Sequence, residues 1–68
     1  MSDREALYLT DPERALVSPG KRRRYRYRLT FRLRQTFYTR WFKSAGDLSD
    51  YRHAHEPDLV VVSVSEEP

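Results

Sequence analysis

The feature that most constrains the fold is a strict alternation of apolar and polar residues from position 24 to position 34. Five apolar residues alternate there with five arginines and one threonine: Tyr25, Tyr27, Leu29, Phe31 and Leu33 against Arg24, Arg26, Arg28, Thr30, Arg32 and Arg34. Successive side chains of a β-strand point to opposite faces, so a period of two predicts a strand with one buried and one solvated face. The arginines then form a row on the solvated face.

The chain has to reverse direction near residues 34–36. A strand of nineteen residues running on to Lys43 would be roughly 60 Å long at about 3.3 Å per residue, too long for a domain of 68 residues. A two-residue loop would put Arg40 opposite a buried apolar residue. A three-residue loop keeps that charge out of the core and pairs Leu33 with Phe37, Phe31 with Thr39 and Leu29 with Trp41. We therefore predict the three-residue loop, with a bulge or a longer loop left open because no glycine is present there.

The second half of the chain predicts one helix and one further strand. Ser44 and Asp47 resemble a capping box, and Pro57 ends the helical stretch that follows them. The β-branched run from Leu59 to Val64 predicts the closing strand. With a right-handed crossover, the order strand, strand, helix, strand predicts an α+β fold with a three-stranded antiparallel sheet (β-β-α-β, order 2-1-3) and one helix on one face.

The first twenty residues predict an N-terminal arm that is flexible or forms a short helix. The stretch "TDPER", with Asp11 as the cap and Pro12 in the first turn, is typical of a helix start. "SPG" at positions 18–20 then predicts a break. The expected organisation is an arm over residues 1–20 and a single ββαβ domain over residues 21–68.

Charge is segregated along the sequence. The formal net charge of +3 is the balance of +10 within residues 21–43 and −7 over the rest of the chain. A block of ten cations without an acid produces a local field that attracts anions, whatever the small net charge suggests. Nucleic acids and acidic protein surfaces are therefore the leading classes of partner.

The solvated face is the predicted binding surface, joined by the "KRRR" segment that precedes the strand. Guanidinium groups form bidentate contacts with phosphates, and exposed rings stack on unpaired bases. We expect a non-enzymatic small basic module that binds DNA or RNA, although the arginines could instead serve only to keep a solvated face soluble. The candidate residues are Lys21, Arg22, Arg23, Arg24, Arg26, Arg28, Arg32, Arg34, Tyr38, Arg40 and Phe42.

Other kinds of site find little support in the sequence. The chain has no cysteine, and His53 and His55 are two residues apart, a spacing that puts them on different sides of a helix. No glycine-rich phosphate loop or nucleophile arrangement is present. We expect no metal, no cofactor and no enzyme activity. The longest aliphatic run, Leu59 to Val62, is too short to span a bilayer, so no membrane contact is expected and the predicted location is the cytoplasm.

The element order also resembles a known family. With "TRWF" at the end of one strand, "KSAGDLSD" at a capped helix start and "PDLVVVSV" as the last strand, the chain resembles the short host-RNA-polymerase inhibitors of podoviruses. That topological resemblance implies an alternative function: a phage-type inhibitor or regulator of transcription that binds an acidic surface of a host protein such as RNA polymerase. The protein would act in the host cytoplasm, as a monomer or as a homodimer formed through a sheet face or edge.

Overall fold

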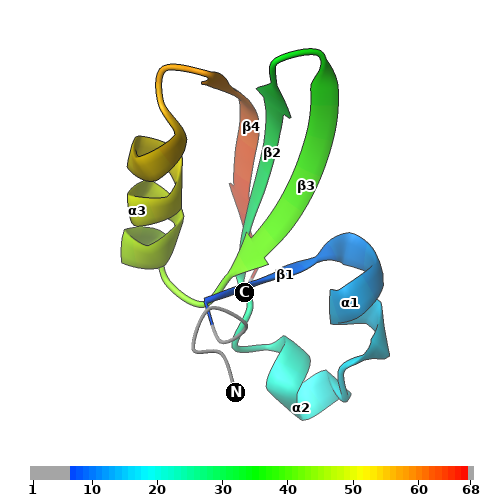
Figure 1. Cartoon of the computed structure of the whole chain (residues 1–68). Helices are drawn as coiled ribbons and strands as arrows, with labels where there is room; N and C mark the ends of the chain where they lie inside the picture. The colour runs from blue at the N-terminus through cyan, green and yellow to red at the C-terminus, as the bar shows by residue number, and fades with distance from the viewer. Residues whose placement is uncertain (1–6, 68) are drawn as a thin grey trace, which may run out of the picture.

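The computed structural model describes residues 7–67, which form a four-stranded antiparallel sheet and three helices (Figure 1). The strands lie in the order β1-β3-β2-β4. The prediction of a three-stranded sheet with one helix is wrong, because the N-terminal segment adds a strand and two helices. The elements are β1 (Tyr8–Thr10), α1 (Asp11–Leu16), α2 (Pro19–Arg22), β2 (Tyr27–Leu33), β3 (Thr36–Phe42), α3 (Ala45–His55) and β4 (Leu59–Glu66).

Strand β1 is the element that the sequence did not reveal. Its three residues pair with the end of β3, Tyr8 opposite Phe42 and Thr10 opposite Arg40. The Tyr8 ring packs 5.7 Å from the ring of Phe42 and 5.1 Å from that of Tyr51 on α3. Three residues are too few to show a period, so this strand depends on tertiary contacts rather than on local propensity.

Helix α1 begins with a complete capping box, and the cap is Thr10 rather than the predicted Asp11. The Thr10 amide donates to the Glu13 carboxylate at 3.0 Å, and the Glu13 amide donates to the Thr10 hydroxyl at 3.5 Å. The hydrogen bond from the Thr10 amide, and after it the Thr10 side chain, hold the pKa of the Glu13 carboxyl group below its ordinary value. The cap fixes the direction in which α1 leaves the sheet.

The β2–β3 hairpin has a two-residue turn at Arg34 and Gln35. Leu33 pairs with Thr36 and Leu29 pairs with Arg40, so the predicted three-residue loop and its register are wrong. Arg34 adopts a φ of 61° and supplies the left-handed conformation that would otherwise favour glycine. The observed register buries Phe42 completely and turns Trp41 to the opposite face. Arg40 thereby lies on the core side, half-buried beside the rings of Tyr8, Tyr38 and Tyr51.

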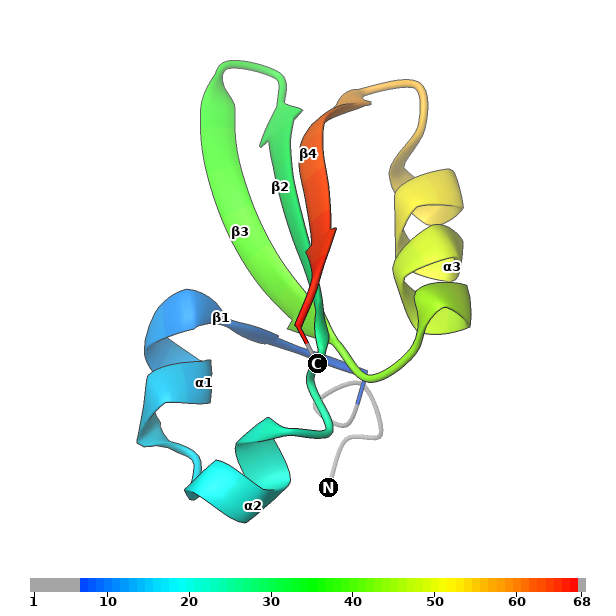
Figure 2. The same ribbon diagram turned by 180° about the vertical axis from the view of Figure 1, so that it is seen from behind.

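The core lies between the sheet and α3, and its buried residues are Leu29, Phe31, Phe42, Leu48 and Leu59. Helix α3 begins as predicted at Ser44, whose hydroxyl accepts a hydrogen bond from the Asp47 amide at 3.1 Å. Figure 2 shows α3 on one side of the sheet and α1 on the other. The two faces of the sheet are therefore covered by different parts of the chain.

The closing strand β4 forms as predicted and occupies one edge of the sheet. Its pairing with β2 shifts between Thr30 and Phe31: Thr30 pairs with Ser63, whereas Phe31 pairs with Val61. Val62 is therefore the extra residue of a β-bulge. Four valines of this strand are exposed: Val60, Val61, Val62 and Val64.

Candidate nucleic-acid interface

The face of the sheet opposite α3 carries an ordered array of side chains, which we call the open face. Because paired residues of neighbouring strands share a face, the register defines three rows across β3, β2 and β4. The rows are Phe37, Arg32 and Val60; Thr39, Thr30 and Ser63; and Trp41, Arg28 and Ser65. Two arginines of one strand thus lie on either side of a row of hydroxyl groups.

Arg28 and Arg32 present their charges to solvent. Both are exposed, and neither forms an ion pair or a hydrogen bond with an acidic side chain of residues 7–67. Between them the hydroxyl oxygens of Thr30 and Thr39 lie 3.4 Å apart. Phe37, 65% exposed, stands directly opposite Arg32. This end of the open face therefore combines free cations, hydroxyl groups and one accessible ring.

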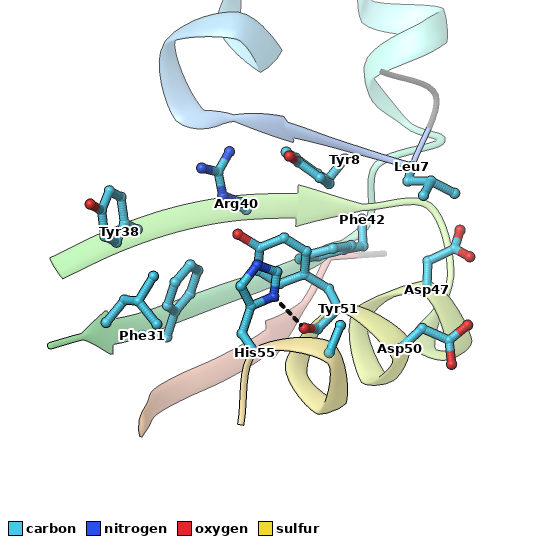
Figure 3. A pocket seen from close by; sticks show the side chains of 12 residues that line it. Leu7, Tyr8, Phe31, Tyr38, Arg40, Phe42, Asp47, Asp50, Tyr51 and His55 are labelled. Atoms are coloured by element: carbon cyan, nitrogen blue, oxygen red, sulfur yellow. Dashed lines mark hydrogen bonds between the residues drawn. The ribbon is translucent and has the colours of Figure 1, made fainter. Parts of the chain in front are cut away.

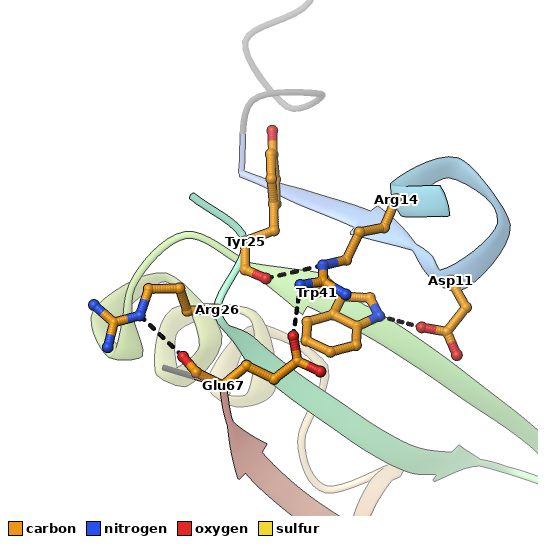
Figure 4. A network of polar contacts seen from close by, with 6 residues as sticks. All are labelled: Asp11, Arg14, Tyr25, Arg26, Trp41 and Glu67. Atoms are coloured by element: carbon orange, nitrogen blue, oxygen red, sulfur yellow. Dashed lines mark hydrogen bonds and ion pairs between the residues drawn. The ribbon is translucent and has the colours of Figure 1, made fainter. Parts of the chain in front are cut away.

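The other end of the open face is covered by α1 (Figure 4). The guanidinium of Arg14 lies 3.5 Å from the centre of the Trp41 ring. Its Nε donates to the Tyr25 carbonyl at 3.1 Å, and a terminal nitrogen donates to the Glu67 carboxylate at 2.8 Å. The indole nitrogen of Trp41 donates to the Asp11 carboxylate. Arg28, which pairs with Trp41, stays exposed, so the region available to a ligand runs from Arg28 to the hairpin turn, and we call this region the hairpin half of the face.

The basic segment 21–24 is ordered in the structure. Lys21 and Arg22 form the last turn of α2, and the amide of Arg24 donates to the Lys21 carbonyl at 3.0 Å. Lys21, Arg23 and Arg24 are exposed. Arg22, Arg23 and Arg26 line a shallow pocket of about 280 Å³ together with Arg14 and Glu67. The fold therefore gathers several of the predicted cations beside the covered end of the open face.

Arg26 and Arg34 lie outside the hairpin half of the open face and differ in whether their charge has a partner. Arg26 forms an ion pair with Glu66 at 3.2 Å and donates to the backbone carbonyl of Glu67 at 3.1 Å. Its charge is already partly compensated within the protein. Arg34 is exposed at the β2–β3 turn, beyond Arg32. Of these two arginines, Arg34 is the better placed to extend a contact made by Arg28 and Arg32.

Three predicted site residues do not belong to the open face. The observed register places Tyr38, Arg40 and Phe42 on the α3 side, where they line a cavity (Figure 3). Phe42 is 0% exposed and belongs to the core, so it cannot stack on a base. The prediction that these three residues share a surface with Arg28 is wrong, because it depended on the three-residue loop. Phe37 supplies the exposed ring in their place.

The two histidines show no arrangement suited to metal binding. His55 Nδ1 donates to the carbonyl of Tyr51 at 2.9 Å, and its ring packs 4.3 Å from the Tyr51 ring. His53 contacts Arg52 at the surface. Within residues 7–67, no three side chains of the metal-binding types gather at one point.

Comparisons with known proteins identified no relative that could indicate a function. No family model matches the chain, and no similar curated protein or solved structure was found. None of the helices described for residues 7–67 has the length and apolar character needed to cross a bilayer. The resemblance to phage polymerase inhibitors therefore remains a prediction.

Proposed function

We propose that this protein binds nucleic acid through the hairpin half of its open face. The observation that carries the proposal is the pair Arg28 and Arg32, both exposed and without an acidic partner among residues 7–67. Surfaces that serve only solubility mix charges of both signs, which lets neighbouring side chains neutralise one another. Apart from the Arg28 guanidinium, which lies 5.6 Å from the centre of the Trp41 ring, neither group has a partner among the described residues, so both can bind an external anion.

The geometry of the surface suits a phosphate backbone. Arg28 and Arg32 are four residues apart on one strand, a separation of about 13 Å. Successive phosphates of one B-DNA strand advance about 3.4 Å along the helix axis, so the two side chains can reach different phosphates of the same strand. The hydroxyl groups of Thr30 and Thr39 lie between them; one of the two donates to the other, and the one that accepts can donate its own hydrogen to a phosphate oxygen.

Phe37 gives the surface a preference for unpaired bases. Its ring stands beside Arg32 and is largely exposed, so a base splayed out of a single strand can stack on it. One such contact stabilises a complex by roughly 1–3 kcal/mol. A duplex keeps its bases stacked inside and gains only the phosphate contacts. Single-stranded nucleic acid is therefore the preferred form of the ligand.

The test is a fluorescence-anisotropy titration with single-stranded and double-stranded oligonucleotides at several salt concentrations. The double variant R28Q/R32Q should bind more weakly, and the slope of log affinity against log salt should decrease in magnitude by about 1.4 for single strands. R52Q is the matched control, because Arg52 lies on α3 and forms an ion pair with Glu56 at 3.5 Å. Wild-type affinity in the double variant would exclude the open face as the site.

A companion variant separates stacking from charge. Phe37→Ser should weaken binding to single strands by roughly tenfold or more and leave binding to duplexes nearly unchanged. If the wild-type protein bound neither oligonucleotide at low salt, the nucleic-acid proposal would be refuted. The acidic protein partner expected from the phage resemblance would then be tested by capture on the purified chain, again with R28Q/R32Q as the variant.

A further inference from the structure

A second candidate site lies on the opposite side of the sheet, between β1, β3 and α3. It is a cavity of about 540 Å³, within the range of pockets that hold small molecules (Figure 3). Five aromatic residues contribute to its lining: Tyr8, Phe31, Tyr38, Phe42 and Tyr51. Rings from three strands and one helix thus surround a space large enough for a flat molecule.

One guanidinium group, that of Arg40, lies among these rings. Its Cζ is 4.6 Å from the centre of the Tyr8 ring, 5.7 Å from that of Tyr51 and 5.9 Å from that of Tyr38. These distances allow cation–π attraction, which compensates part of the charge. The side chain stands opposite Leu29, a residue of the core, and is half-buried.

Hydrogen bonding at Arg40 is incomplete. Its Nε is buried and has no partner among residues 7–67, and no carboxylate of those residues lies within ion-pair distance of the guanidinium. A cation withdrawn from water without an anionic partner is unfavourable, and buried polar atoms are nearly always satisfied. Arg40 lines the cavity, so the exposed part of its guanidinium is the cation that a ligand bound there would meet.

The charges around the cavity restrict the ligand class. A single guanidinium can balance one negative charge, and its fork matches the two oxygens of a carboxylate. Asp47 and Asp50 also line the cavity, but Figure 3 shows them on α3, apart from Arg40, so one carboxylate can bind at the Arg40 end whereas a second negative charge extending towards them would be repelled. The apolar, ring-bearing walls favour a flat apolar body attached to the carboxylate.

We propose that this cavity binds a small aromatic monocarboxylate, with the carboxylate on Arg40 and the ring among the tyrosines. The site faces away from Arg28 and Arg32 and uses none of the open-face residues. It is therefore independent of nucleic-acid binding, and either proposal can fail without the other.

The experiment is a titration of the ¹⁵N-labelled full chain with 2-naphthoate, followed by amide chemical shifts, with 2-naphthamide as the neutral probe of the same shape. We expect saturable shifts in β3 and α3 near the cavity, and an affinity for the carboxylate about tenfold or more above that for the amide. The variant R40Q should reduce this preference to near unity. R32Q, the matched arginine of the open face, should keep it.

Several results would overturn the proposal. Equal affinity for naphthoate and naphthamide would show that Arg40 does not recognise the carboxylate. Shifts confined to the open face would place the ligand elsewhere, and an absence of saturable shifts would exclude the site. R40K guards against misfolding of R40Q: it keeps the charge but loses the fork, and its preference for the carboxylate should fall between those of wild type and R40Q.

Discussion

Arg14 and Arg40 occupy comparable positions on opposite faces of the same sheet. Each guanidinium is withdrawn from solvent against aromatic rings, Arg14 over Trp41 and Arg40 beside Tyr8. Arg14 also donates to a backbone carbonyl and forms an ion pair with Glu67. Arg40 has no carboxylate within ion-pair distance among residues 7–67, and its Nε is unsatisfied.

The difference separates a structural arginine from one suited to binding. Arg14 ties α1, the segment that precedes β2 and the C-terminal segment together through its bonds to the Tyr25 carbonyl and the Glu67 carboxylate, so its charge has a partner within the protein. Arg40 contributes a charge that the described part of the protein compensates only in part, through the rings of Tyr8, Tyr38 and Tyr51. Counting arginines in the sequence therefore does not show which of them can serve a ligand. The partners assigned to each guanidinium by the fold decide this.

The largest expected change in stability comes from replacing Arg14, the arginine whose head group has partners within the protein. Arg14→Leu should lower the free energy of unfolding by about 2–3 kcal/mol, because it breaks a charged hydrogen bond and a cation–π contact and leaves the Tyr25 carbonyl without its donor. Urea denaturation followed by circular dichroism measures this change. Arg52→Leu, which removes an exposed helix ion pair, is the control and should cost well under about 1 kcal/mol.

A smaller loss is expected from the cap that orients α1 and therefore Arg14. Thr10→Ala removes the hydroxyl that accepts from the Glu13 amide and should cost about 1 kcal/mol. Thr36→Ala, at an exposed position next to the hairpin turn, is the matched substitution and should change stability by less than about 0.5 kcal/mol. Equal effects of the two variants would contradict a capping role for Thr10.

Replacing Arg40, the arginine with an unsatisfied Nε, should have a smaller effect on stability and of the opposite sign. Arg40→Leu should leave the free energy of unfolding unchanged or raise it by up to about 1 kcal/mol, since an apolar side chain replaces a half-buried charge without an anionic partner. The same urea titration gives the value. A loss as large as that of Arg14→Leu would mean that the tyrosine rings fully compensate Arg40, and the comparison between the two arginines would fail.

The smallest effect is a dependence of stability on alkaline pH. Burial raises the pKa of Tyr51, although the charge of Arg40 acts in the opposite direction. The folded state therefore favours the neutral phenol, and this stabilisation is present below the ordinary tyrosine pKa and lost as pH rises through the raised value. In urea titrations from pH 8 to 11, Tyr51→Phe should reduce the decline. Part of the decline should remain in this variant, because burial also raises the pKa of Tyr25.

The sequence predicted the elements that have a clear local signal. The period of two located β2, the Ser44 cap located α3, and β-branching located β4. Strand β1 was missed because three residues show no period. The β2–β3 register could not be predicted, because burying Arg40 was expected to be too unfavourable. The rings of Tyr8, Tyr38 and Tyr51, which reduce that cost, surround Arg40 only in the folded structure.

The candidate surface was predictable only in its central strand. Arg28 and Arg32 follow directly from the alternation, whereas Phe37 depends on the register and Arg14 on the docking of α1. Arg14 and Glu67 are 53 residues apart in the sequence. No local pattern relates such residues, so the partners that neutralise Arg14 could not be inferred from the sequence.

The bulge at Val62 also affects how this molecule can meet a copy of itself. If two copies of this strand pair through a two-fold axis, the axis has to pass between two copies of the same residue. Neighbouring pairs of an antiparallel ladder are alternately hydrogen-bonded and non-bonded, so no axis can lie between them. In a regular strand, Val61 and Ser63 would point to the same face of the sheet. The extra residue Val62 puts them on opposite faces, so a regular ladder with a second copy cannot continue across the bulge. The valine-rich edge is thereby divided into two short segments, neither of which offers the full strand to a symmetric partner.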